Sequence, residues 1–162
     1  MDTQIFTSQP NKIGGNTYIK LQLDGQTPAV MSMYYVQEVL IIPINRITPM
    51  PNMPKCVLGL LNRRNRVLWA IDLVQLLNLQ PVDINAQQYH VVIIRVNQVP
   101  LALVVQEVKG ITRFTPDCIQ STVEFITADI TPYIDGCIPQ QQETLLVLNA
   151  EAIAHSPILH KY

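Results

Sequence analysis

Apolar and polar residues alternate along much of the chain with the two-residue period of β-strands. Between residues 17 and 23, Ile19, Leu21 and Leu23 fall on one face and polar residues fall on the other. This is the pattern of a strand with one buried side. An Asp-Gly pair at 24–25 then gives a hairpin-type turn signal. The N-terminal part of the chain therefore predicts a half-buried strand that ends in a tight turn.

Similar apolar runs recur at close spacing through the rest of the chain. Further short strands are predicted at 28–33, 34–42, twice within 57–73, and at 89–96, 99–105, 111–114, 123–126, 130–138 and 144–148. Short helices are predicted near 73–79 and 150–155, with Asp72 and Asn149 as their N-cap residues. Many short strands and little helix indicate a mainly β protein built of barrels or a sandwich.

One proline-rich segment interrupts this pattern at 43–54, where four of twelve residues are proline. Each proline fixes φ and removes a backbone donor, which excludes a helix or an interior strand and predicts a stiff extended connection. Residues 1–16 are polar and show no periodicity, so a mobile N-terminal tail is expected there. A chain of 162 residues can bury a sizeable core, so we expect a stable monomer of two small lobes that share one interface.

A basic turn lies between the two apolar runs of residues 57–73. Arg63, Arg64 and Arg66 occupy three of four consecutive positions. Guanidinium groups are almost never buried without a partner, so the flanking strands are expected to present this turn on the surface. Such a turn is either a solvated hairpin tip or a positively charged contact surface.

Charge is distributed unevenly along the chain, although the net charge is only −1 and the pI is near 6.3. Five basic residues and no acidic residue lie between Glu38 and Asp72, whereas six acidic residues and only Lys161 follow Phe114. A net charge this close to zero does not indicate the positively charged surface that nucleic-acid-binding proteins carry. The asymmetry is typical of a protein that docks in a defined orientation. Hydrophobic residues make up 48% of the chain, which is consistent with a partner-facing surface or with a compact β-rich core.

The sequence lacks the common signatures of enzymes and cofactor sites. It contains no GxGxxG, GxxxxGK[ST], HExxH or GxSxG motif, so we expect no catalysis, no cofactor and no metal. Three widely spaced cysteines without a CxxC pair indicate neither a disulfide framework nor a zinc site, and they suggest a reducing cytosol. No secretion signal or membrane span is predicted. The single tryptophan, Trp69, is expected to be a core or inter-lobe ring.

Short motifs follow one another in a fixed order along most of the chain. They are VQEV at 36–39, ITP at 47–49, GLLNRRN at 59–65, IDL at 71–73, VVQEV at 104–108, YIDG at 133–136 and the strand at 145–149. From about Thr17 to Ala154 this series resembles the CheW family of chemotaxis coupling proteins, whose pattern is roughly VxEV, a proline-flanked segment, GVxNLRG, PVxDL, a VVDxV strand and a closing strand before a last short helix. Each motif alone is weak, but their order and spacing are specific.

The resemblance implies two intertwined five-stranded, SH3-like β-barrel lobes around a shared hydrophobic core. It places one CheW-like domain at 17–155, with a first-half lobe at about 30–80 and a second lobe at about 85–150 that is completed by the 17–29 strand. A C-terminal tail is expected at 156–162. A protein of this family is a cytoplasmic, non-enzymatic adaptor without membrane insertion. It couples the cytoplasmic tip of methyl-accepting receptors to the regulatory domain of a CheA-type histidine kinase within arrays.

The resemblance also implies two contact sites on this chain. The receptor site is expected on the basic turn, with Arg64 as the main contact beside Asn62, Arg63 and Asn65. The kinase site is expected on Val36, Glu38 and Val39. Structural turns are expected at Gly59, Asp72 and Gly136.

Three positions depart from the family pattern. Arg63 replaces a leucine, Asn65 replaces a glycine, and Gln106 replaces an aspartate. Asparagine still tolerates the left-handed conformation that glycine favours, so the turn is expected to keep its shape. An alternative hypothesis is a β-barrel that binds or senses a small ligand, motivated by the apolar richness of the chain and by Trp69.

Overall fold

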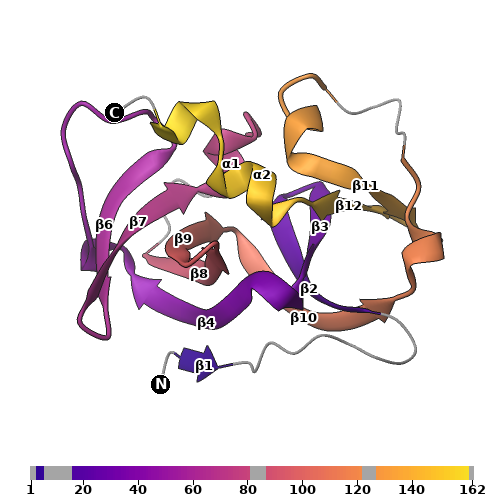
Figure 1. Ribbon diagram of the computed structural model, residues 1–162, viewed down its shortest axis with the longest axis horizontal. Helices are drawn as coiled ribbons and strands as arrows, with labels where there is room; N and C mark the ends of the chain where they lie inside the picture. Colours follow the sequence, from indigo (N-terminus) through magenta and orange to yellow (C-terminus); the bar gives the residue numbers. More distant parts are fainter. Residues whose placement is uncertain (1–2, 6–15, 81–86, 122–126, 161–162) are drawn as a thin grey trace.

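The computed structural model describes residues 3–5, 16–80, 87–121 and 127–160, which form two β-sheets with little helix (Figure 1). The strands are β1 (Thr3–Ile5), β2 (Asn16–Asp24), β3 (Thr27–Ser32), β4 (Val36–Pro43), β5 (Ile47–Thr48), β6 (Val57–Arg63), β7 (Arg66–Asp72), β8 (Gln88–Val96), β9 (Val99–Val105), β10 (Glu107–Phe114), β11 (Ile134–Pro139) and β12 (Thr144–Leu148). The α-helices are α1 (Leu73–Leu76) and α2 (Ala150–Ala154), and the 3₁₀ helices are η1 (Met33–Tyr35), η2 (Ile44–Arg46), η3 (Pro116–Cys118), η4 (Thr131–Tyr133) and η5 (Pro157–His160). The predicted mainly β fold with two short helices is confirmed.

The two sheets lie side by side, with α1 and α2 above the junction between them (Figure 1). The larger sheet has the order β1-β4-β8-β9-β7-β6-β5, and the smaller sheet has the order β10-β2-β3-β12-β11. Each sheet contains one parallel pair, in which Ala70 of β7 lies opposite Ala102 of β9 and Leu146 of β12 lies opposite Ala29 of β3. All other recorded pairs are antiparallel.

The membership of the sheets corrects the lobe boundaries expected from the sequence. β8 and β9 were expected in the second lobe, but they pair with β4 and β7 in the larger sheet. β3 belongs to the smaller sheet, where it pairs with β2 and β12. The smaller sheet has the expected five strands, whereas the larger sheet has seven because the short β1 and β5 are added at its edges. Closure of either sheet into an SH3-like barrel stays a prediction.

A hydrophobic core joins the two sheets and both α-helices. Its fully buried members include Leu21 of β2, Met31 of β3, Leu103 of β9, Leu73 of α1 and Ile153 of α2. Complete burial of one such side chain stabilises the folded state by about 1.5–3 kcal/mol. The predicted shared core therefore lies where the sheets meet, and it fixes the position of one sheet on the other.

A second cluster fills the interior of the larger sheet. Leu40 of β4, Leu61 of β6, Leu68 of β7 and Val91 of β8 are all buried in it. This packing anchors the β6–β7 hairpin close to its tip, which carries the basic turn.

Several connecting segments differ from the sequence-based expectations. Thr3–Ile5, expected in a mobile tail, form a strand against β4, and the rest of the tail except residue 16 lies outside the described residues. The proline-rich segment contains η2 and the edge strand β5 within its extended path. The strand predicted at 130–138 is η4 followed by β11. Most of the expected C-terminal tail forms η5. The strand predicted at 123–126 lies outside the described residues.

Backbone geometry also corrects the role of two glycines. Gly59 and Gly136 lie within β6 and β11 at shifts of strand register, not in turns. A Cβ on Gly59 would lie 2.0 Å from the carbonyl oxygen of Thr48, so β5 can approach β6 only because this residue has no side chain. Asp72 is an N-cap, as predicted, because its carboxylate accepts from the Gln75 amide at 3.3 Å.

No helix within the described parts of the chain is long and apolar enough to cross a membrane.

Candidate partner-binding site

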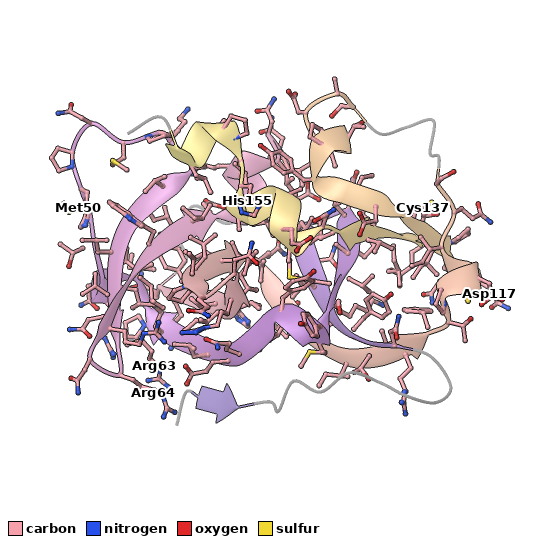
Figure 2. The ribbon with its side chains drawn as sticks, viewed as in Figure 1. Met50, Arg63, Arg64, Asp117, Cys137 and His155 are labelled. Carbon is pink, nitrogen blue, oxygen red and sulfur yellow. The ribbon has the colours of Figure 1, made fainter. Side chains whose placement is uncertain are left out.

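The basic turn is a two-residue β-hairpin loop of fixed geometry. Arg63 at the end of β6 lies opposite Arg66 at the start of β7. The connecting residues, Arg64 and Asn65, both have positive φ, at 54° and 63°. Positive φ at both central positions is the mark of a type I′ turn, whose twist matches that of the flanking strands. The chain therefore presents Arg64 at the tip of a regular hairpin (Figure 2).

The carboxylate of Glu38 in β4 accepts hydrogen bonds from two arginines of this hairpin. Arg63 Nε lies 3.2 Å from each carboxylate oxygen, and Arg63 Nη2 also contacts Oε2. Arg64 Nη2 lies 3.3 Å from the same Oε2. Figure 2 shows Arg63 and Arg64 together at the hairpin tip, beside β4. We call Glu38, Arg63 and Arg64 the charged triad.

The triad has a buried side and an exposed side. The side chains of Glu38 and Arg63 are 9% and 19% exposed, whereas that of Arg64 is 59% exposed. Hydrogen bonds from Arg63 hold the pKa of Glu38 below its usual value, the positive charges of both arginines act in the same direction, and burial alone would raise that pKa. Two guanidinium groups share one carboxylate, so the triad keeps a surplus positive charge on its solvent-facing side.

Comparisons with known proteins agree on one family. The sequence profile of the CheW-like domain matches residues 17–157, which is most of the chain. The chain belongs to the CheW family. A probable chemotaxis protein CheW from Rhizobium etli is 32% identical over 108 residues, which cover 65% of this chain and 68% of that protein. The crystal structure of the scaffolding protein TtCheW from Thermoanaerobacter tengcongensis has the same fold, with a TM-score of 0.73 at 16% identity over 84% of this chain and 90% of that one.

The four residues expected at a receptor site of the CheW type lie together on the hairpin. Asn62, Arg64 and Asn65 are exposed, and they occupy the end of β6 and the turn. Arg63 departs from this arrangement because its guanidinium points back to Glu38 and is mostly buried. One of the two hairpin positions that differ from the family motif is thus occupied by the arginine that joins the hairpin to β4.

The residues expected at a CheW-type kinase site, Val36, Glu38 and Val39, are buried in this structure, and their role in kinase binding stays a prediction. Val36 and Val39 are core residues at the junction of the two sheets, and the carboxylate of Glu38 is already bonded to Arg63 and Arg64. Around the start of β4, the exposed side chains are those of Tyr34 and Gln37. The sequence motif lies on β4, and the structure shows which side chains near it reach the surface.

Sequence reasoning missed two features of this CheW-like domain. The first is the pairing of Glu38 with Arg63. Glu38 is a lone carboxylate in an apolar strand, and a buried carboxylate needs a partner, so the sequence could have predicted that Glu38 is paired. The second is Trp69, which was expected in the core or between the lobes but is 40% exposed on β7. The alternation along β7 could have indicated this exposure, because Leu68 and Ala70 on either side of Trp69 face the core.

Proposed function

We propose that this chain is a non-enzymatic adaptor that couples methyl-accepting receptors to a CheA-type histidine kinase at the cytoplasmic side of receptor arrays. Membership of the CheW family supports the scaffold role. One observation carries the assignment of the receptor site: Arg64 is exposed at the tip of a type I′ turn whose charged triad has a surplus positive charge. Chemotaxis, phototaxis and pilus-based motility are all outputs that such an adaptor could serve.

The proposed receptor contact uses the free side of Arg64. A guanidinium group can donate several charge-assisted hydrogen bonds to a carboxylate or to the carbonyls at a helix end. Arg64 makes one long contact with Glu38, and the shorter contacts of that carboxylate belong to Arg63. A receptor group could therefore engage Arg64 while Arg63 continues to neutralise Glu38.

The proposed kinase contact lies near the start of β4, on a separate part of the larger sheet. Tyr34 is 62% exposed there and packs edge-on against Tyr35, with ring centroids 5.1 Å apart. Gln37 is also exposed. Aromatic rings held in place by a neighbour are good interface anchors because little conformational entropy is lost on binding. Tyr34 and Gln37 therefore replace the buried valines as the proposed kinase-facing side chains.

The alternative of a small-ligand β-barrel has lost one of the two observations that favoured it, the expected position of Trp69. Trp69 lies on the face of β7 opposite the core residues Leu68 and Ala70, so it does not line the interior of the larger sheet. A thermal-shift screen that found a stabilising metabolite would revive that alternative, because a ligand that binds only the folded state raises stability.

Replacement of Arg64 by glutamate tests the receptor site. We expect Arg64→Glu to weaken pull-down by a receptor cytoplasmic fragment by about tenfold or more, because an attractive charge becomes a repulsive one at the contact. Pull-down by the kinase regulatory domain is expected to stay unchanged. Binding curves for both partners measure the two effects separately.

Arg113→Glu is the matched control, because Arg113 is an exposed arginine on β10 of the smaller sheet. Both variants must show the wild-type unfolding transition before their affinities are compared. Receptor binding that is unchanged in Arg64→Glu, or weakened equally in Arg113→Glu, would overturn the site assignment.

A further inference from the structure

A polar pocket of about 400 Å³ lies between η1, the β8–β9 turn and α2. Its lining side chains include Tyr34, Tyr35, Gln37, Arg95 and Glu151. Small-molecule sites in proteins have volumes of roughly 300–1,000 Å³, so the pocket is large enough for a small ligand. We call it the Arg95 pocket. No residue of the β6–β7 hairpin lines it, so it is separate from the basic turn.

The guanidinium of Arg95 has a buried nitrogen without a partner. Arg95 lies near the end of β8, opposite Pro100 of β9. Among the described residues, its Nε is the one buried side-chain nitrogen or oxygen that has no hydrogen-bond partner. The buried carboxylate of Glu38, by contrast, accepts hydrogen bonds from Arg63. Burial of an unpaired charged group destabilises the folded state, so an acceptor from outside the described chain is expected at Arg95.

The hydroxyl of Tyr35 adds a second donor to the pocket. Burial raises the pKa of Tyr35, and the negative charge of Glu151 acts in the same direction. The hydroxyl therefore stays protonated at neutral pH and can donate a hydrogen bond. The ring of Tyr35 packs edge-on against that of Tyr34, which holds it in place.

Amide side chains on β4 and on the β8–β9 turn complete the set of donors. Gln37 lines the pocket from β4, and Asn97 and Gln98 line it from the turn. The two turn residues have positive φ, at 50° and 67°, which is the geometry of a type I′ turn. A guanidinium donates two parallel hydrogen bonds to a carboxylate, and hydroxyl and amide donors can satisfy the lone pairs that remain. The chemistry of the pocket therefore matches a carboxylate.

Glu151 limits the charge of the ligand. It is exposed in the first turn of α2 and lines the same pocket as Arg95. A second carboxylate on the ligand would be repelled by Glu151. A ligand with one carboxylate is therefore favoured over a ligand with two.

We infer that the Arg95 pocket binds a single carboxylate group, which accepts hydrogen bonds from the Arg95 guanidinium and the Tyr35 hydroxyl. The carboxylate belongs either to a small free organic acid or to an acidic side chain of the kinase. The first source is a binding activity beyond the adaptor function and does not depend on it. The second rests on the proposed function, because the proposed kinase-facing residues Tyr34 and Gln37 line the same pocket.

The Nε–H group of Arg95 reports directly on this binding, because it is the buried donor that lacks a partner. The probe is sodium acetate at about pH 7, where a carboxylate is ionised, titrated into the full chain and followed by proton–nitrogen correlation NMR. The Arg95 signal is identified as the Nε–H signal that disappears in Arg95→Gln. We expect this signal to shift downfield and to saturate as acetate binds.

Arg95→Gln should weaken acetate binding by about tenfold or more, because the charged donor is lost. The backbone amide signals of Asn97 and Gln98 measure the affinity in both proteins. Glu151→Gln should strengthen acetate binding, because it removes a repelling charge from the pocket. The two variants are thus predicted to act in opposite directions, and effects in the same direction would overturn the inference.

Two controls separate this binding from a general effect of salt. Sodium chloride at the same ionic strength should leave the Arg95 signal almost unmoved, because chloride cannot accept two parallel hydrogen bonds from one guanidinium. Arg46→Gln is the matched variant, since Arg46 is an exposed arginine in η2 and does not line the pocket. It should bind acetate with less than about a twofold change in affinity. Equal shifts in acetate and chloride would contradict the inference.

Unfolding in urea shows whether Arg95 serves binding or folding. Because its Nε has no partner to lose, Arg95→Gln should keep the wild-type midpoint. Acetate should raise the midpoint of the wild type and not that of the variant, since it binds only the folded pocket. A variant midpoint far below the wild-type value would assign Arg95 a role in folding and would overturn the inference.

Pull-down by the kinase regulatory domain, without acetate, identifies the source of the carboxylate. Kinase binding that falls by about tenfold or more in Arg95→Gln assigns the carboxylate to the kinase. Acetate binding with unchanged kinase binding in Arg95→Gln assigns the pocket to a free organic acid. If acetate does not bind and the variant binds the kinase normally, the inference is overturned and the adaptor function survives. A wild-type chain that binds acetate but not the kinase overturns the adaptor function alone.

Discussion

Glu38 is a carboxylate in a strand whose neighbouring residues are mostly buried, and two arginines from a hairpin stabilise its charge. The two arginines are adjacent in sequence but have different surroundings. Arg63 ends β6 and points toward β4, whereas Arg64 begins the turn with positive φ and remains largely exposed. Arg63 therefore links the hairpin to β4, and the exposed guanidinium of Arg64 can contact a partner.

The lowered pKa of Glu38 predicts a stability that depends on pH. Because the folded-state pKa lies below the unfolded-state value, the stabilisation is fully present above the unfolded-state pKa and is lost as pH falls through the folded-state pKa. At neutral pH we expect Glu38→Gln to lower the free energy of unfolding by about 1–3 kcal/mol. The difference between the variant and the wild type should shrink in acid. Urea unfolding from about pH 7 down to about pH 3 measures it.

Glu107→Gln is the control for this experiment, since Glu107 pairs with Lys109 at 3.3 Å and both side chains are more than two-fifths exposed. An exposed pair of this kind contributes less than about 1 kcal/mol. If Glu38→Gln had no larger effect than Glu107→Gln at neutral pH, the triad would not hold the hairpin in place.

At the scale of elements, local patterns predicted individual strands well and their partners poorly. The alternation in β2, the apolar runs of β8 and β9, and the N-caps Asp72 and Asn149 all followed from residues close in sequence. The parallel pairing of β7 with β9 depends on contacts between residues far apart in the chain. Alternation indicates which face of a strand is buried but not which sheet the strand joins, so the lobe boundaries were wrong.

The close approach of β5 to β6 predicts an unequal effect of alanine at two glycines. Gly59 and Gly110 have similar φ values of +145° and +143°. A Cβ at Gly59 would lie 2.0 Å from the backbone oxygen of Thr48, whereas a Cβ at Gly110 would meet nothing within 4 Å. Gly110→Ala should cost about 1–3 kcal/mol from backbone strain alone. Gly59→Ala should cost more, because β5 must also move.

Chemical denaturation of the two alanine variants measures this difference. Gly110→Ala serves as the internal control for strain, since it shares the backbone conformation but not the close contact. Equal losses of stability in the two variants would show that the close approach of β5 to β6 adds nothing to the cost of alanine at Gly59, which would contradict this prediction.

At the scale of the whole molecule, the sequence identified the family and the fold, whereas the predicted receptor and kinase sites stay predictions. The ordered motifs pointed to the CheW family, and the prediction of Arg63, Arg64 and Arg66 on one hairpin turn holds in the structure. The contact between Arg63 and Glu38 was not foreseen, because it joins residues 25 positions apart on strands that do not pair. Burial of Val36 and Val39 was missed because it depends on how the two sheets pack together.

The structure brings the two proposed partner surfaces onto one rigid unit. The hairpin with Arg64 and the start of β4 with Tyr34 belong to the larger sheet or adjoin it, and the shared core fixes that sheet against the smaller one. A molecule of this kind can hold two partners at a set separation without moving parts. The central claim of the proposed function is therefore the simultaneous binding of receptor and kinase.

Co-sedimentation tests this property most directly. Receptor cytoplasmic fragments attached to vesicles are mixed with the kinase, with and without the chain, and the kinase in the pellet is measured. We predict that the kinase sediments with the receptors only when the wild-type chain is present, and that Arg64→Glu abolishes this effect although it still binds the kinase. Equal sedimentation of the kinase without the chain, or a chain that binds one partner only by excluding the other, would contradict the adaptor function.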